Sequence, residues 1–275
     1  MFYLKLLIFF LLVHVHPLSA AFVSHEEAKH IGQLIWKNEC GGSLLGLTSW
    51  NEGEEFASLG IGHFIWYPHG YNGPFKQMFP ELLKFYQANR VAVPTWLIAA
   101  HGCPWSSREA FLEDLQSAKM QELRKLLGDT IELQAIFISQ RLEKTLPALT
   151  KNLSAKEAQH VQKQFYRVAQ AVMGLYPLID YINFKGEGVD PKENYKGHGW
   201  GLLQVLLLMS DDTAHPIEEF VSAAKKVLAQ RVKNAPLDRN EERWLKGWFN
   251  RLDTYNAASK RAKAKEFIKH SGLGI

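Results

Sequence analysis

Hydrophobic residues along this chain recur mainly with the spacing of an amphipathic helix. The first such run contains Ala28, Ile31, Leu34 and Ile35, which share one helix face because residues three and four positions apart are neighbours there. The run stops before the paired glycines 41–42, and glycine is the residue that most often ends a helix. The pattern therefore predicts a helix that begins near residue 25 and ends close to residue 40.

Capping-box sequences mark further helix starts. In such a box a Ser, Thr or Asp caps the first turn and a Glu three residues later bonds back to it. The dipeptide His215-Pro216 marks another start, since proline is favoured in the first helical turn. These signals predict a chain that is mainly α. The boxes are Ser24 to Glu27, Ser106 to Glu109, Ser154 to Glu157 and Asp238 to Glu241.

Residues 43–67 have a different pattern. This stretch is rich in Gly, Thr, Ser and aromatic residues, with turn residues at Asn51-Glu52-Gly53, which is typical of a β-hairpin or a three-stranded ribbon. Later, a glycine-rich loop from Gly186 to Gly201 interrupts the helical pattern. We expect one domain over residues 22–275, a helical body with a small β-ribbon lobe.

The first 21 residues resemble a secretory signal peptide. Lys5 precedes a short apolar run, Leu6 to Val13, and small residues follow at Ser19 to Ala21. The apolar run falls short of the roughly 20 residues that span a bilayer. We therefore expect cleavage after Ala21 and a mature protein that is periplasmic or secreted, with no stable insertion in the membrane.

Composition narrows the possible classes. The chain is 47% hydrophobic and 22% charged, with a formal net charge of +4, which is typical of a globular protein. This charge is too small and dispersed to favour nucleic acid as a partner, but it suits an anionic polymer. The two cysteines, Cys40 and Cys103, permit either one disulfide or two buried thiols. No Cys/His grouping has zinc spacing, so no metal or other cofactor is expected.

Glu39 is the first candidate for chemistry. Cleavage of a glycosidic bond needs a partly desolvated carboxylic acid to protonate the leaving oxygen, and a second polar group to stabilise the cation or activate water. Glu39 stands at the predicted end of the first helix, directly before the ribbon and near Trp36 and Cys40. Its position suits the proton donor.

Residues 25–67 resemble the phage-type lysozymes (muramidases). The ribbon contains Ser58-Leu59-Gly60-Ile61-Gly62-His63, which is similar to the T-I-G-x-G-H strand that follows the catalytic Glu in that family. The resemblance implies a lysozyme-like fold, with a cleft between ribbon and helical body, and it strengthens the assignment of Glu39.

The same family has an Asp on the ribbon as its second catalytic acid, and this chain has no Asp there. We expect Glu54, with Glu52 as the second choice, to stabilise the transition state or activate water together with Ser58. His63 is expected to brace the ribbon and the Glu39 carboxylate. The change from Asp to Glu leaves the stereochemistry of the product open.

The glycine-rich segment supplies a second group of candidates. Its end, Gly201-Leu202-Leu203-Gln204, looks like the G-L-M-Q stretch of lytic transglycosylases and goose-type lysozymes, whose catalytic Glu lies upstream. Glu187 is therefore the alternative to Glu39. We interpret the segment as the far wall of the cleft, where Glu187 holds the loop. Sugar rings stack on flat aromatic faces, so Trp66, Tyr195 and Trp200 are expected to contact the substrate. Gln204, at the end of the same segment, is expected to contact it as well.

The combined prediction is an exported, monomeric glycosidase that cleaves β-1,4 bonds of peptidoglycan or a related polysaccharide. One alternative keeps the fold and changes the reaction or substrate, to a lytic transglycosylase or a chitosanase. Another is a secreted protein that binds glycan without catalysis, an alternative favoured by the missing Asp.

Overall fold

The computed structural model describes residues 23–71, 73–210 and 213–271. The predicted signal segment lies outside the described residues. Within them the structure is mainly helical, as the sequence predicts, and it contains two small antiparallel sheets, of which the sequence predicts the first. Among the helices that can be described, none is long and apolar enough to cross a membrane.

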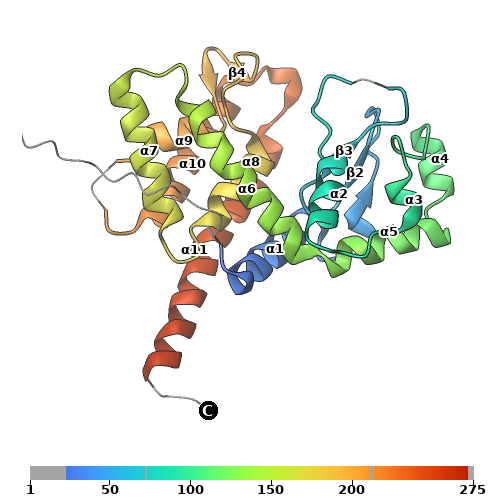
Figure 1. The fold of residues 1–275 in the computed structure, drawn as a ribbon. Coiled ribbons are helices and arrows are strands. Elements are labelled where there is room, and N and C mark those ends of the chain that lie inside the picture. The colour runs from blue at the N-terminus through green and yellow to red at the C-terminus, as the bar shows by residue number, and fades with distance from the viewer. Residues whose placement is uncertain (1–22, 72, 211–212, 272–275) are drawn as a thin grey trace, which may run out of the picture.

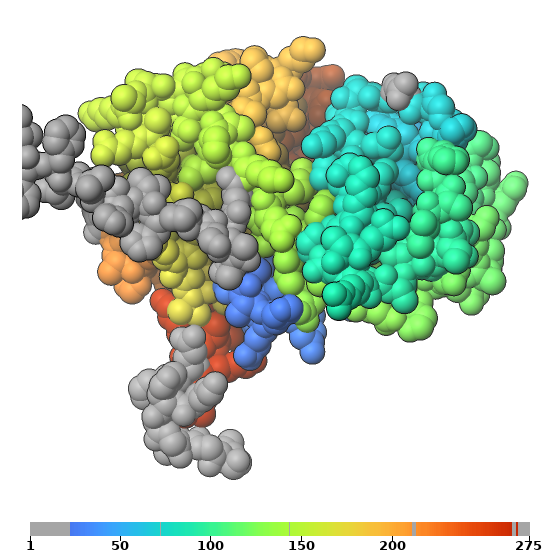
Figure 2. All heavy atoms as spheres, in the orientation of Figure 1, coloured from blue at the N-terminus to red at the C-terminus, as the bar shows by residue number. Residues whose placement is uncertain are grey.

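A helical body and a smaller lobe that carries the β-ribbon make up the molecule (Figure 1). The body contains α1 and the later helices, while the lobe holds the ribbon with short helices beside it. Between them runs α6, and the surface is hollowed where the two parts meet (Figure 2). The helices of the body are α1 His25–Cys40, α6 Ile131–Thr150, α7 Ala155–Ala169, α8 Leu175–Lys185, α9 Leu202–Leu208, α10 Pro216–Asn234, η2 Leu237–Arg239 and α11 Glu242–Ser271.

The β-ribbon is a three-stranded antiparallel sheet in the order β1-β2-β3. Its register pairs Ser58 with Ser49 on one side and with Ile65 on the other. A second, two-stranded sheet lies inside the segment that the sequence predicted only as a glycine-rich loop. The remaining elements are η1 Leu45–Leu47, β1 Thr48–Ser49, β2 Ala57–Leu59, β3 Phe64–Trp66, α2 Phe79–Ala88, α3 Thr95–Ile98, α4 Arg108–Glu113, α5 Ala118–Asp129, β4 Asn194–Tyr195 and β5 His198–Gly199.

Several helix boundaries follow the predicted caps. Ser24 accepts a hydrogen bond from the Glu27 backbone at the start of α1, and Gly41 ends that helix with a left-handed φ of 61°. Ser154 and Glu157 form the complete capping box of α7. The start of α10 at Pro216 is also confirmed.

Two predicted caps are displaced. At α4 the capping residue is Ser107 rather than Ser106, and its hydroxyl accepts from the Ala110 backbone. The predicted box from Asp238 to Glu241 does not form, because the Glu241 carboxylate is engaged by Arg231 instead. The helix accordingly begins after it, at Glu242.

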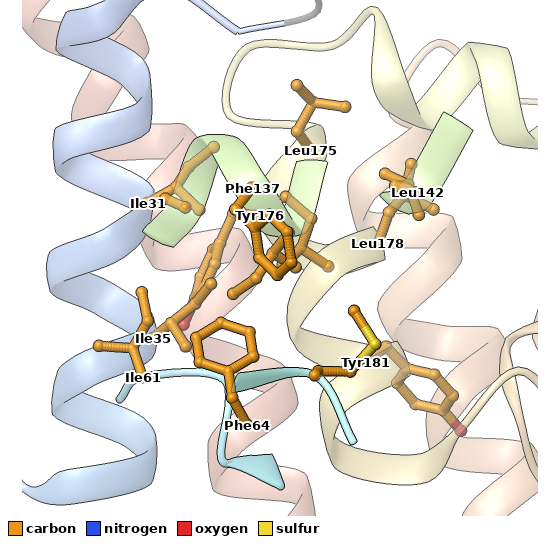
Figure 3. Close-up of a cluster of buried hydrophobic side chains, with 14 of the residues drawn as sticks. Ile31, Ile35, Ile61, Phe64, Phe137, Leu142, Leu175, Tyr176, Leu178 and Tyr181 are labelled. Carbon is orange, nitrogen blue, oxygen red and sulfur yellow. The ribbon is translucent and has the colours of Figure 1, made fainter. Parts of the chain in front are cut away.

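The core joins ribbon and body through the turn between β2 and β3. Ile61 of this turn and Phe64, the first residue of β3, lie between α1 and α8 near Phe137 of α6 (Figure 3). Gly60, in this turn, has a φ of 70°, and a Cβ on it would lie 2.3 Å from Gln134 Oε1. The glycines of the lysozyme-like motif thus serve the packing of this turn.

The side chain of Gln134, on α6, hydrogen-bonds to both the same turn and α5. Its Oε1 accepts from the Ile61 backbone N–H at 2.9 Å, and its Nε2 donates to the Leu127 carbonyl at 2.7 Å. The side chain is fully buried, so both bonds are made where water cannot replace them.

Substituting Gln134→Leu should therefore lower the free energy of unfolding by about 2–4 kcal/mol, because two buried backbone groups lose their partners. Urea unfolding followed by tryptophan fluorescence measures this. The exposed Gln140 on the same helix provides the control, since Gln140→Leu should change stability by about 0.5 kcal/mol or less. Equal effects of the two substitutions would contradict the role of Gln134.

Candidate functional site

Glu39 occupies the last turn of α1, as predicted. Its carboxylate is 14% exposed and accepts a hydrogen bond from Arg251 Nη2 of α11. Because Gly41 stops the helix two residues later, the chain turns away here toward η1 and the ribbon. Glu39 therefore lies at the junction of the helical body and the ribbon lobe.

Arg251 is shared between two carboxylates. It donates to Glu39, and it also makes a two-bond contact with Asp180 of α8, with distances of 2.8 Å from Nε to Oδ2 and 2.9 Å from Nη2 to Oδ1. Asp180 is fully buried and also accepts from the Tyr255 hydroxyl at 2.7 Å. A buried carboxylate needs such compensation, since an isolated one would be far too costly to desolvate.

The surrounding pKa shifts keep this network in one charge state. Burial alone lowers the pKa of Arg251, but its hydrogen bond to Asp180 and the charges of Asp180 and Glu39 raise it above its usual value. Burial, with the charge of Asp180, raises the pKa of Tyr255 well above its usual value. Arg251 thus stays a cation, and Tyr255 stays a hydrogen-bond donor.

The cysteines are free thiols in the structure, which selects that alternative over the disulfide. Burial, and next the charge of Glu39, raises the pKa of Cys40 to about 12. Burial raises the pKa of Cys103 to about 12 as well. The thiolate is the reactive form, so neither residue is suited to act as a nucleophile.

The described residues contain no cluster of His, Cys, Asp and Glu that could hold a metal ion.

The ribbon carboxylates lie in the turn before β2. Glu54 is partly exposed, and its carboxylate accepts from Asn51 Nδ2 at 3.0 Å, whereas Glu52 is exposed. Since β2 begins only at Ala57, strand alternation does not set which way these carboxylates face. Ser58 is 4% exposed within β2, so it lies inside the lobe rather than on its surface.

The two other ribbon candidates are a turn residue and a core residue. His63 has a φ of 45° in the turn between β2 and β3 and is partly exposed. Within the part of the chain that the structure describes, the hydrogen-bond donor to Glu39 is Arg251 and not His63. Trp66 is 1% exposed and packs on Phe79, with 4.8 Å between ring centroids, so its ring presents no free face to a sugar.

Gln204 and Glu187 brace the glycine-rich segment. The Gln204 amide accepts from the Gly201 backbone N–H at 2.9 Å and donates to the Gly188 carbonyl at 3.0 Å. Glu187 accepts from the hydroxyl of Thr145, on α6, at 3.3 Å. The Gln204 amide is thus committed to the loop itself, while Glu187 holds the loop against α6.

Tyr195 and Trp200 lie together, with 4.7 Å between ring centroids. Arg231 of α10 lies over Trp200, 4.1 Å from the ring centroid. Arg231 pairs with Glu241 at 2.7 Å, and the Tyr195 hydroxyl donates to the same carboxylate at 2.9 Å. These rings are therefore fixed by charged partners, and both remain partly exposed.

A row of alternating rings and cations connects this pair with Glu39. Arg231 also faces Trp248, at 5.3 Å from the ring centroid. Lys185 Nζ lies 3.5 Å from the Trp248 centroid and 4.0 Å from the Phe184 centroid, and Arg251 lies 4.3 Å from Phe184 on the other side. Trp248, Lys185 and Arg251 are not singled out by the sequence, because the contacts that join them link α8 with α11.

Lys185 is the cation of this row whose pKa is lowered to near neutrality. Burial lowers its pKa to about 7, with the charge of Arg231 as the next cause, and the opposing charge of Glu241 is not enough to restore it. Its ammonium form is therefore disfavoured in the folded protein relative to the unfolded chain.

Removing the Arg251 guanidinium should destabilise the fold strongly. We expect Arg251→Met to lower the free energy of unfolding by about 3–5 kcal/mol, because Asp180 is then left buried without its cation. Urea unfolding measures the change. Arg243, an exposed α11 residue that lies over Trp244, is the matched control, and Arg243→Met should cost less than about 1 kcal/mol. Comparable losses for both variants would refute the proposed compensation.

Lys185 should make stability depend on pH. Between pH 7 and 9 the unfolded lysine binds a proton that the folded one has mostly lost, so stability rises with pH through this window. Lys185→Met should abolish that rise and should be more stable than the wild type at pH 6. Thermal unfolding of both proteins from pH 6 to 9 measures it, and parallel curves would show that Lys185 is not the source.

Comparison of the chain with protein-family models, with curated proteins and with solved structures finds no match. The resemblance of residues 25–67 to phage-type lysozymes therefore stays a prediction from the sequence. Inferences about function depend on the geometry described above.

Proposed function

We propose that the protein is an exported glycoside hydrolase that cleaves β-1,4 bonds of peptidoglycan, with Glu39 as the proton donor. The observation that carries this proposal is the partly exposed Glu39 carboxylate, held at the body–ribbon junction by an arginine that is already paired with a buried aspartate. This gives an acid of fixed orientation at the junction of the two lobes.

Arg251 holds Glu39 in a fixed orientation without pairing with it alone. Asp180 makes a two-bond contact with the same guanidinium and compensates its charge. The Glu39 side chain keeps 14% of its surface exposed. The group therefore combines a fixed orientation with access to solvent.

The ribbon offers the second polar group. Glu54 is tethered by Asn51 and partly exposed, while Glu52 is more open to solvent. We assign water activation or stabilisation of the cation to one of these two residues, because a glycosidase needs a second polar group besides its acid. Glu54 is our first choice because its carboxylate is already oriented.

Aromatic side chains on the helical body supply surfaces for sugar rings. Tyr195 and Trp200 are partly exposed, and Trp244 is 39% exposed. Tyr195 and Trp200 belong to the row of rings and cations that leads to Glu39, and Trp244 lies next to Trp248 of that row. This spread of rings supports binding of an extended glycan rather than a single sugar. A lytic transglycosylase or a chitosanase would use the same arrangement.

A second candidate function is glycan binding without catalysis. The observation that favours it is the hydrogen bond from Arg251 to Glu39, because this contact already engages the Glu39 carboxylate. In that case the aromatic row would bind sugar, and Glu39 would be a structural partner of α11.

Digestion of purified peptidoglycan sacculi tests the proposal. Mature wild type should release soluble fragments, and Glu39→Gln should lower the rate by about 10²–10⁴-fold, because the amide has the same shape but cannot deliver a proton. Mass analysis of the fragments separates reducing ends, made by a hydrolase, from anhydro ends, made by a transglycosylase.

The matched control is Glu55→Gln, which removes an exposed carboxylate of the ribbon turn and should retain activity within about twofold of the wild type. Thermal unfolding should confirm that both variants stay folded. Equal release by wild type and Glu39→Gln would overturn the role of Glu39, and binding to sacculi without release by either would favour the non-catalytic candidate.

A further inference from the structure

Lys185 belongs to the row of alternating rings and cations, and it has no part in the proposed reaction. Its Nζ lies between the rings of Trp248 and Phe184, at 3.5 and 4.0 Å from their centroids. Contacts of an ammonium with aromatic faces stabilise it only modestly. That is less than a buried charge normally requires, so the two rings alone do not account for a lysine at this position.

Its cationic neighbours have carboxylate partners. Arg231 pairs with Glu241, and Arg251 pairs with Asp180. Both oxygens of Glu241 already accept hydrogen bonds from Arg231, one of them also from Tyr195. Among the described residues no carboxylate forms an ion pair with Lys185, which makes it the uncompensated charge of the row.

Lys185 is the last residue of α8 and is partly exposed. We take this exposed part as the side from which a ligand approaches.

Aromatic faces for a sugar lie beside it. Trp244 and Trp248 are neighbours on α11, with 6.1 Å between ring centroids, and Trp244 is among the exposed large side chains. A pyranose ring stacked on Trp244 would lie next to Trp248, whose ring also contacts the Lys185 ammonium. The chemistry that suits this pair of features is a sugar with an anionic substituent.

We propose that Lys185, together with Trp244 and Trp248, forms a subsite for a sugar that carries a carboxylate. The ligand's carboxylate would supply the counter-ion that the protein omits. The lactyl ether of N-acetylmuramic acid and the carboxylate of a uronic acid share this chemistry. The inference rests on the proposed function in taking a glycan as the ligand, and it adds the group that is recognised.

The subsite should be sensitive to pH. The charged groups that face Lys185 are Arg231 of α10, Arg251 of α11 and Glu241, which precedes α11. Burial and the charge of Arg231 lower the pKa of Lys185 to about 7, so the ammonium form is the main one at pH 6 and a minor one at pH 9. Preference for an acidic sugar should weaken over this range, while stacking of a neutral sugar should not.

Calorimetric binding in the Glu39→Gln background tests the subsite without cleavage. The probes are a peptide-free tetrasaccharide of alternating N-acetylglucosamine and N-acetylmuramic acid, a hyaluronan tetrasaccharide and neutral chitotetraose. At pH 6 and low salt, at least one acidic probe should bind about tenfold more tightly than chitotetraose, as expected for one charge-assisted contact. The acidic probe that binds more tightly identifies the source of the carboxylate.

Adding Lys185→Gln should remove this preference and leave the affinity for chitotetraose within about twofold. Lys185→Arg should keep the preference at pH 9, where the wild-type lysine loses it, because arginine remains charged. The control is Lys225→Gln, which removes a lysine that lies 5.5 Å from the Phe249 centroid and pairs with Asp253. It should leave the preference unchanged.

Equal binding of acidic and neutral probes, or a preference that survives Lys185→Gln in a folded variant, would overturn the subsite. Binding of none of the probes would overturn it as well. Failure of the two proposals is distinguishable. Release of fragments from sacculi without any acidic preference leaves the hydrolase and removes the subsite, whereas acidic preference without release leaves the subsite and removes the hydrolase.

Discussion

The buried ion pair between Asp180 and Arg251 is the interaction on which the arrangement of the site depends. Asp180 is fully buried, so its charge has to be met by donors from the protein itself. Arg251 and Tyr255 meet it from α11. This requirement fixes α11 against α8, and through Arg251 it also fixes Glu39 at the end of α1. Residues 71 and 212 positions apart in the sequence are thereby held at one junction.

Charge compensation also explains the neighbouring part of the site. Glu241 is 2% exposed and is satisfied by Arg231 and Tyr195, and this contact holds the β4–β5 hairpin against α10. Lys185 departs from the rule, because it has aromatic partners but no counter-ion in the described chain. An exception to charge pairing in an otherwise paired row is the kind of feature that a ligand completes.

Local signals in the sequence predicted much of the fold. The Ser24 cap and the glycines after Cys40 give the bounds of α1, and the box from Ser154 to Glu157 gives the start of α7. These signals act within a few residues, so tertiary contacts did not change them. The predicted box at Asp238 failed for the opposite reason, since Glu241 bonds more favourably to Arg231 of another helix than to its own backbone.

The candidate site was predicted only in part. The position of Glu39 follows from where α1 ends, which the sequence indicates. Its partners could not be inferred, because the contact of Arg251 with both Glu39 and Asp180 arises from packing of distant helices. Trp66 and Gln204 show the converse limit, since side chains suited to sugar are used to fill the core and to brace a loop. The residue type could be read from the sequence, but whether the side chain is exposed to a ligand could not.

The most direct test of the account is a crystal structure of Glu39→Gln bound to a peptidoglycan tetrasaccharide. We predict that the glycan lies between the ribbon and the aromatic row. A glycosidic oxygen should be within hydrogen-bond reach of the residue 39 side chain, at about 2.6–3.2 Å. A glycan bound elsewhere on the molecule, or along the aromatic row with every glycosidic oxygen beyond reach of residue 39, would contradict the assignment of Glu39 as the proton donor.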